Sequence, residues 1–240
     1  MASPTFGLNT RPAFDLQLLG EEREPVLVVD RVLQEPQRLV DYAAETASFD
    51  PVIPGRNGYP GVRSPAPLGY VRDVVTALRP AIDQVFGLEG VAAPARAECS
   101  LSIVTLPPDQ LLPAQRMPHV DTVDPLQFAV LHYLCSDAFD GTAFYRHRST
   151  GFETITPERE APFHARLDSE VAACPPPPAY VSGDTELFAQ TGRVEARFDR
   201  LVVYRSRLLH SGQIDPQAQL SPDPRKGRLT ANIFLNYRAL

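Results

Sequence analysis

A His-x-Asp motif and one distant histidine have the side chains that a metal site would need. His119 and Asp121 are separated by one residue in the stretch QRMPHVDT, and His210 lies downstream in VVYRSRLLHSG. Alternate residues of a β-strand point the same way, so a His-x-Asp on a strand directs an imidazole and a carboxylate into one space. A second imidazole from another strand would complete a two-histidine, one-carboxylate site, which suits non-haem Fe(II) oxygen chemistry.

The His-x-Asp motif also has an ordinary explanation, because the tripeptide is common by chance and an isolated histidine is usually a polar residue satisfied by its neighbours. Three further histidines, His132, His147 and His164, are interpreted as structural or exposed. Asp124 offers another carboxylate, but Pro125 follows it and its spacing from His119 is not that of alternate strand residues. The rest of the chain must decide whether the motif binds a metal.

Composition limits the class of protein. The 240 residues include 43% hydrophobic and 22% charged side chains, values typical of a soluble globular protein with one large domain. The formal charge of −6 argues against a surface for nucleic acid or anionic membranes. The sequence has neither a signal-peptide core nor an apolar stretch that could span a bilayer, so we expect a cytoplasmic protein. Its three cysteines suggest neither a disulfide framework nor a zinc site.

The N-terminal part, 1–95, is predicted to support the rest of the fold. Residues 25–33 are rich in β-branched side chains and predict a strand, and 37–49 predict a helix. The segment 50–67 is dense in Pro and Gly and predicts an irregular ordered loop or lid. Residues 68–88 have apolar side chains at helical spacing, interrupted by a proline, and predict one kinked helix or two.

The C-terminal part, 96–240, has the pattern of a β-rich core. Residues 139–142, FDGT, predict a hairpin turn because Asp-Gly readily adopts positive φ. Residues 156–174 predict one inserted helix, closed by a run of prolines. Segments rich in Val, Ile, Tyr, Phe and Thr predict strands over 99–106, 126–134, 142–148, 192–198, 200–206 and 228–237. The expected fold is a single α+β domain, 1–240, mainly β with flanking helices, built as an antiparallel sandwich or barrel.

The order of these motifs resembles the Fe(II)- and 2-oxoglutarate-dependent oxygenases, especially prolyl-hydroxylase-like members and small bacterial biosynthetic enzymes. The resemblance covers roughly residues 97–238 and rests on several short motifs in order. His119 and Asp121 match the family's first iron motif, and His210 matches its distal histidine. Tyr133 lies where these members carry a tyrosine that reaches the cosubstrate, and FDGTAFYRH resembles their acidic-Gly turn and next strand. The resemblance implies a double-stranded β-helix, the cupin-like jelly roll.

The last predicted strand has residues that the family uses to hold 2-oxoglutarate. Alternation places Arg228, Thr230 and Asn232 on one face, so a guanidinium and a hydroxyl are available to the same carboxylate. Arg is well suited to such a bidentate contact. Arg228 comes 18 residues after His210, farther than in many members, and a longer surface loop explains the difference.

Arg225 and Lys226 stay open as alternatives to Arg228. With Arg228 taken as the basic residue, the resemblance implies an oxidoreductase. It would hold Fe(II) through His119, Asp121 and His210. It would hold 2-oxoglutarate through Arg228, Thr230, Tyr133 and Asn232. Such dioxygenases couple the conversion of 2-oxoglutarate and O2 into succinate and CO2 to the oxidation of an unactivated C–H bond. Hydroxylation is expected first, and a radical ring closure such as cyclopropanation stays open. Halogenation is disfavoured, because halogenating members leave the carboxylate position vacant.

Residues outside the metal motif must recognise the substrate. Tyr59 and Arg63 lie in the proline-rich loop, which would act either as a lid over a barrel mouth or as a packing loop. An Arg63 that faced the pocket would suit a carboxylate such as that of an amino acid. Arg116 and Arg146 are further candidates. The expected partner is a free small molecule, an amino acid or a derivative from specialised biosynthesis, bound by a monomer or homodimer.

Two other functional classes stay open. A cupin-like isomerase or hydrolase would use a similar triad without 2-oxoglutarate, and it would not need Arg228 to face the metal. A catalytically silent jelly-roll binding module would tolerate loss of any ligand. Individual residues have structural explanations too, since Tyr133 suits core packing and Arg228 a surface ion pair. The position of Arg228 relative to the triad therefore separates the first two classes.

Overall fold

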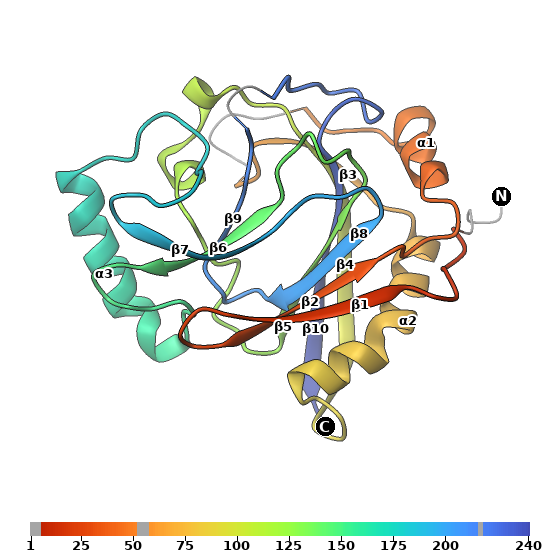
Figure 1. The fold of residues 1–240 in the computed structure, drawn as a ribbon, viewed down its shortest axis with the longest axis horizontal. Helices are drawn as coiled ribbons and strands as arrows, with labels where there is room; N and C mark the ends of the chain where they lie inside the picture. The colour runs from red at the N-terminus through yellow and green to blue at the C-terminus, as the bar shows by residue number, and fades with distance from the viewer. Residues whose placement is uncertain (1–5, 52–57, 216–217) are drawn as a thin grey trace.

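Two antiparallel sheets make up most of the protein, which a computed structural model describes over residues 6–51, 58–215 and 218–240 (Figure 1). The larger sheet has the strand order β1-β2-β8-β5-β10-β4-β3. Its strands are β1 (Ala13–Leu19), β2 (Glu24–Asp30), β3 (Gly61–Pro65), β4 (Ala92–Val104), β5 (Gln127–Tyr133), β8 (Arg200–Arg205) and β10 (Leu229–Ala239). The smaller sheet, in the order β7-β6-β9, contains β6 (Thr142–His147), β7 (Phe188–Val194) and β9 (His210–Gly212).

Helices cover the outer faces of both sheets. The helices α1 (Gln37–Glu45) and α2 (Leu68–Phe86) share an apolar cluster with the larger sheet. The helix α3 (Pro157–Ala173) packs through Phe163 against the smaller sheet, on the side of the molecule away from α1 and α2 (Figure 1). Short 3-10 turns follow β4, over Pro108–Gln110 and Pro113–Arg116. Among the described residues, no helix combines the length and apolar character needed to cross a bilayer.

Alternation along the central strands gives the larger sheet two apolar faces. On β8, Leu201 and Val203 pack toward α1 and α2, while Val202 and Tyr204 join a cluster shared with the smaller sheet. Burying such a side chain stabilises the fold by about 1.5–3 kcal/mol. On β10, Leu229 and alternate residues after it take the helix side. The opposite face of β10 carries Phe234 and the strand's polar residues, Thr230 and Asn232 among them.

The expectation of a mainly β fold with flanking helices is confirmed. Strands of the N-terminal part, 1–95, enter the same sheet as strands of the C-terminal part, and β4 crosses the predicted boundary at residues 95 and 96. The predicted helices at 37–49, 68–88 and 156–174 correspond to α1, α2 and α3, with α2 continuous through its proline.

The prediction of irregular structure throughout 50–67 is wrong for residues 61–65. These form β3, which pairs with β4 at the edge of the larger sheet. A proline is tolerated on an edge strand because the outer side of that strand has no neighbouring strand to which an N–H would donate. Pro65 is the last residue of the edge strand β3. Residues 52–57 of the predicted lid lie outside the described part of the chain.

The predicted hairpin at FDGT is also wrong, because β5 and β6 belong to different sheets. The segment crosses from the larger sheet to the smaller one. Gly141 does not have a positive φ. Glycine is needed at this position because a side chain would not fit. A Cβ on Gly141 would lie 1.7 Å from the carbonyl oxygen of Val194. Glycine therefore allows two backbones to approach at the crossing.

We expect Gly141→Ala to destabilise the protein by about 3 kcal/mol, because the clashing partner is backbone and cannot rotate away. Denaturant unfolding measures the effect. Gly87→Ala is a suitable control: Gly87 ends α2 with a φ of 67° and has no described atom near its Cβ position. This control should lose only about 1 kcal/mol. Equal losses in the two variants would contradict the steric explanation.

Local signals also missed two strands and displaced a third. β1 carries its apolar residues on one face, yet Phe14 and Leu16 remain about half exposed, at 51% and 50%. β9 has only three residues, too few for a periodic pattern. The strand predicted at 192–198 lies instead at Phe188–Val194, so β7 begins four residues earlier. The bounds of short or exposed strands therefore depend on the strands with which they pair, rather than on a pattern in their own sequence.

Candidate metal centre and ligand pocket

A single antiparallel bridge brings the two motif histidines together. The backbone amides of His119 and His210 each donate to the other's carbonyl oxygen, both at 2.9 Å. His210 begins β9, whereas the His119 stretch is extended chain outside any named strand, so the predicted strand at this motif is reduced to the one bridge. The amide of Asp121 donates to the carbonyl of Ser206 at 2.9 Å. These bonds hold both motif residues against the segment that leads to β9.

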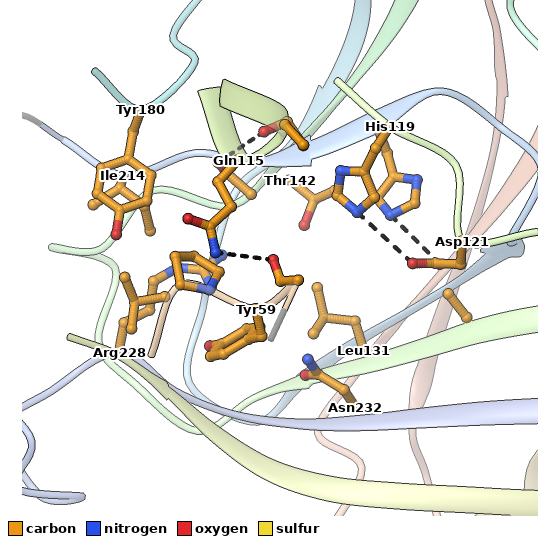
Figure 2. A pocket seen from close by; sticks show the side chains of 18 of the residues that line it. Tyr59, Gln115, His119, Asp121, Leu131, Thr142, Tyr180, Ile214, Arg228 and Asn232 are labelled. Atoms are coloured by element: carbon orange, nitrogen blue, oxygen red, sulfur yellow. Dashed lines mark hydrogen bonds and ion pairs between the residues drawn. The ribbon is translucent and has the colours of Figure 1, made fainter. Parts of the chain in front are cut away.

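The three ligating groups converge at this bridge (Figure 2). Asp121 Oδ1 lies 3.7 Å from His119 Nε2, and Asp121 Oδ2 lies 3.6 Å from His210 Nε2. Both separations are less than twice a metal–ligand bond of about 2.1 Å, so one ion can contact carboxylate and imidazoles together. Two nitrogens and one carboxylate fit a divalent first-row metal such as Fe(II).

The surroundings orient one imidazole and favour the neutral form of the other. His210 Nδ1 donates to the carbonyl oxygen of Leu208 at 2.8 Å, which orients the ring so that Nε2 is the nitrogen directed at Asp121. Enclosure by the pocket atoms and the nearby His210 ring lower the pKa of His119 to about 4. The side chain of His119 is nevertheless 53% exposed, because it faces the open cavity. A neutral His119 can accept a metal at neutral pH without first losing a proton.

The triad lies at one end of a cavity of about 420 Å³. Figure 2 shows Tyr180, Ile214 and Arg228 at the other end, with Leu131 and Asn232 along the wall. The volume lies within the roughly 300–1,000 Å³ of small-molecule sites. The cavity is therefore large enough for small ligands beside a metal.

Arg228 lines this cavity and is only 4% exposed. It immediately precedes β10, and its Nε and Nη2 donate to the carbonyl oxygens of Asp140 and Gly141 at 3.3 and 2.9 Å. The guanidinium carbon lies 5.7 Å from the ring centre of Tyr133. The sheet crossing thus orients Arg228 toward the cavity while leaving Nη1 without a bond to another described residue.

The other expected cosubstrate residues lie at different depths. Asn232 lines the cavity, and its buried Oδ1 has no hydrogen-bond partner among the described residues. Tyr133 and Thr230 lie behind the lining and are fully buried. The Tyr133 hydroxyl bonds Thr142 Oγ1 at 2.6 Å, and burial raises its pKa to about 12. Tyr133 therefore contacts Thr142, a cavity residue, rather than the cavity itself.

The four candidate substrate residues divide into two pairs. Tyr59 and Arg63 line the cavity, and the Arg63 guanidinium lies 4.4 Å above the Tyr59 ring. Arg116 lies outside the lining and donates to the carbonyl oxygen of Leu111. Arg146 also lies outside it and forms an ion pair with Glu21. The structure brings only Tyr59 and Arg63 near the metal centre.

Sequence patterns had not singled out several lining residues, including Thr142, Tyr180 and Tyr204. The Tyr180 hydroxyl donates to the carbonyl oxygen of Leu106 at 2.7 Å. The Tyr204 ring packs edge-on against the His210 ring, with the two ring centres 4.8 Å apart. Strand alternation along 200–206 would have placed Tyr204 on a definite face. Tyr180 follows a proline run, and no local pattern indicates which surface that run meets.

The other histidines are engaged elsewhere. The buried His132 bonds the Tyr70 hydroxyl at 2.9 Å and Asp199 at 3.0 Å. His147 bonds Thr150 and Glu170, both at 2.9 Å. His164 is exposed on α3. Among the described residues, His119, Asp121 and His210 are the group whose ligand atoms are placed to hold a metal ion.

Two of the solved structures similar to this chain are of a novel N-substituted L-amino acid dioxygenase from Burkholderia ambifaria AMMD. The first is 15% identical to this chain with a TM-score of 0.42. The second, in complex with alpha-KG, is 13% identical with a TM-score of 0.41. Each match covers 97% of this chain and 99% of the other. No curated protein matches the sequence.

A protein-family model gives the wider match. It is described as a family of unknown function, DUF6445, and it aligns with residues 10–235. This span includes the triad and Arg228. The chain belongs to the DUF6445 family.

Proposed function

We propose that this protein is an Fe(II)- and 2-oxoglutarate-dependent dioxygenase that oxidises a C–H bond of a small, amino-acid-like molecule. The observation that carries the proposal is the placement of Arg228 in the same cavity as His119, Asp121 and His210. A metalloenzyme that did not use 2-oxoglutarate would not require a buried guanidinium in the same cavity as its metal. We further propose that the two facing sheets form a double-stranded β-helix within a single domain, 1–240.

The chain's own residues have distinct roles in this proposal. His119, Asp121 and His210 hold the metal, and the Leu208 carbonyl fixes the orientation of His210. Arg228 binds the distal carboxylate of 2-oxoglutarate, with Thr230 and Asn232 on the same strand face. Tyr133 positions Thr142 through their hydrogen bond. The loaded site supplies the oxidising power, consuming 2-oxoglutarate and O2 and releasing succinate and CO2 as the substrate is hydroxylated.

Apolar cavity walls favour binding of organic ligands over water. Val104, Leu131 and Ile214 line the same space as the charged groups. Apolar surroundings also strengthen the contact between a guanidinium and a carboxylate, because the effective dielectric is lower than in water. The site therefore combines a guanidinium that can bind an anion with apolar side chains in the same cavity.

The test is anaerobic addition of Fe(II) and 2-oxoglutarate to the purified protein. We expect the metal-to-ligand charge-transfer absorption in the green region to appear only when both are present. A folded protein that binds Fe(II) without this absorption would contradict the proposal and favour a cupin-like metalloenzyme that does not use 2-oxoglutarate. A folded protein that binds neither would favour a silent binding module.

A further inference from the structure

A second guanidinium, that of Arg63, faces the cavity. Cross-strand pairing places Arg63 of β3 beside Ser102 of β4, and Ser102 beside Thr230 of β10. Paired residues on neighbouring strands point to the same face of a sheet. Arg63 therefore shares a face with Thr230 and with Arg228, two residues before it. The register of three strands, rather than a loop conformation, directs Arg63 toward the ligand space.

Arg63 is held in place without an ion-pair contact to any described carboxylate, although the negative charge of Asp121 in the same cavity acts on it. Its guanidinium carbon lies 4.4 Å from the centre of the Tyr59 ring. This cation–π contact fixes the orientation of the guanidinium plane. Its buried Nε has no hydrogen-bond partner among the described residues, and no described carboxylate forms an ion pair with it. Buried guanidinium groups are normally paired. An oriented Arg63 that no described carboxylate contacts indicates a site that an anion completes.

The charges of the cavity specify how much negative charge is missing. Its described lining has two guanidinium groups, Arg63 and Arg228, and one carboxylate, Asp121, which leaves one positive charge. On the function proposed above, Fe(II) adds two positive charges and 2-oxoglutarate two negative charges, which cancel. One positive charge remains after the cosubstrate has bound. A single carboxylate group on the substrate can pair with it.

Two further buried polar atoms indicate the chemistry beside that charge. Asn232 Oδ1 has no hydrogen-bond partner among the described residues, the Tyr59 hydroxyl has only a weak interaction with Thr230, and both side chains line the cavity. Unsatisfied buried polar groups cost free energy that a matching ligand recovers. A hydroxyl can donate to a carboxylate oxygen, and an amide oxygen can accept an N–H. These groups match a ligand that carries both.

We propose that Arg63, stacked on Tyr59, binds the carboxylate of the substrate, and that the substrate is a monocarboxylate with a neighbouring N–H group, as in an amino acid. This inference rests on the proposed function and assigns the two guanidinium groups to different ligands. Arg228 binds 2-oxoglutarate, and Arg63 binds the substrate. Arg63 is therefore a determinant of substrate specificity.

The test compares natural L-amino acids with their primary amides, which keep the N–H group and lose the negative charge. Binding is measured by calorimetry under nitrogen, with Mn(II) in place of Fe(II) and with 2-oxoglutarate present. We expect at least one amino acid to bind and its amide to bind about 10- to 100-fold more weakly, the range for a charge-assisted contact. In Arg63→Met, the acid should lose a similar factor, and acid and amide should bind alike.

Arg63→Lys and Arg96→Met serve as matched variants. Arg63→Lys keeps the charge without the fork and should bind the acid with intermediate affinity. Arg96 is exposed on β4 and pairs with Glu98 away from the cavity, so Arg96→Met should bind the acid as the wild type does. The affinity of 2-oxoglutarate itself, titrated in each protein, should be unchanged in Arg63→Met.

Three results would overturn the inference: no amino acid binds, wild-type protein binds acid and amide equally, or Arg63→Met retains the preference for the acid. Loss of 2-oxoglutarate affinity in Arg63→Met would also overturn it, because Arg63 would then hold the cosubstrate. The charge-transfer absorption separates these failures from failure of the proposed function, since that absorption requires no substrate.

Discussion

Substitution of Asp121 by Asn is expected to weaken Fe(II) binding by at least about 100-fold, since loss of a direct ligand costs more than loss of the outer partners that tune it. Asn keeps the shape of the side chain but removes the negative charge that faces both imidazoles at 3.6 and 3.7 Å. Anaerobic calorimetric titration with Fe(II) measures the change. The rise in Tm that Fe(II) gives the wild type should disappear in the variant, because stabilisation by a ligand follows its affinity.

Asp124→Asn is the matched control for this prediction. Asp124 is the other carboxylate near the motif, but its Oδ1 accepts the backbone N–H of Leu126 at 2.8 Å in a local turn. The control should bind Fe(II) as tightly as the wild type. Unchanged Fe(II) affinity in Asp121→Asn, or an equal loss in the control, would exclude Asp121 as the carboxylate ligand.

Arg228→Met is expected to weaken 2-oxoglutarate binding by about 10- to 100-fold, the range for losing hydrogen bonds to a charged group. Fe(II) affinity should stay unchanged, because Arg228 belongs to the other end of the cavity (Figure 2). The charge-transfer absorption, followed during titration with 2-oxoglutarate, measures the effect. Its midpoint should move to higher 2-oxoglutarate concentration without loss of the final intensity.

Stability must be measured alongside, because Arg228 also bonds the carbonyl oxygens of Asp140 and Gly141. Arg228→Lys keeps the charge and should bind 2-oxoglutarate with intermediate affinity. Arg225→Met is the matched control: Arg225 pairs with Asp41 and Glu45 of α1, away from the cavity. A loss of 2-oxoglutarate affinity in Arg225→Met but not in Arg228→Met would reverse the assignment. Unchanged affinity in both variants would remove the cosubstrate assignment.

The buried strands could be predicted because burial leaves a pattern in the sequence. β5 and β8 are packed on both faces, so they appear as continuous runs of apolar and β-branched residues. β1 and β3 lie at opposite edges of the larger sheet, where one side lacks a partner and the pattern is weaker. For that reason β1 was missed and Arg63 was assigned to a loop.

The turn at FDGT shows a different limit. Its composition is typical of a hairpin, yet the structure uses Gly141 to pass close to Val194 as the chain changes sheets. Local φ preferences predict that a chain bends, but they do not state which sheet receives the next strand. That choice depends on which apolar face remains to be covered, and so it depends on residues far away in sequence.

The sequence by itself determined the mainly β fold and identified His119, Asp121, His210 and Arg228 as residues with complementary chemistry. The fold class follows from residue type and alternation, which are local properties, whereas His210 and Arg228 were identified through the resemblance of the motif order to a known family. Only the tertiary structure decided that the two histidines share one backbone bridge and that Arg63 faces the same cavity while Arg146 pairs with Glu21. The physical reason is that strand register and sheet packing bring distant side chains together, and the free energy of that packing is distributed over the whole core.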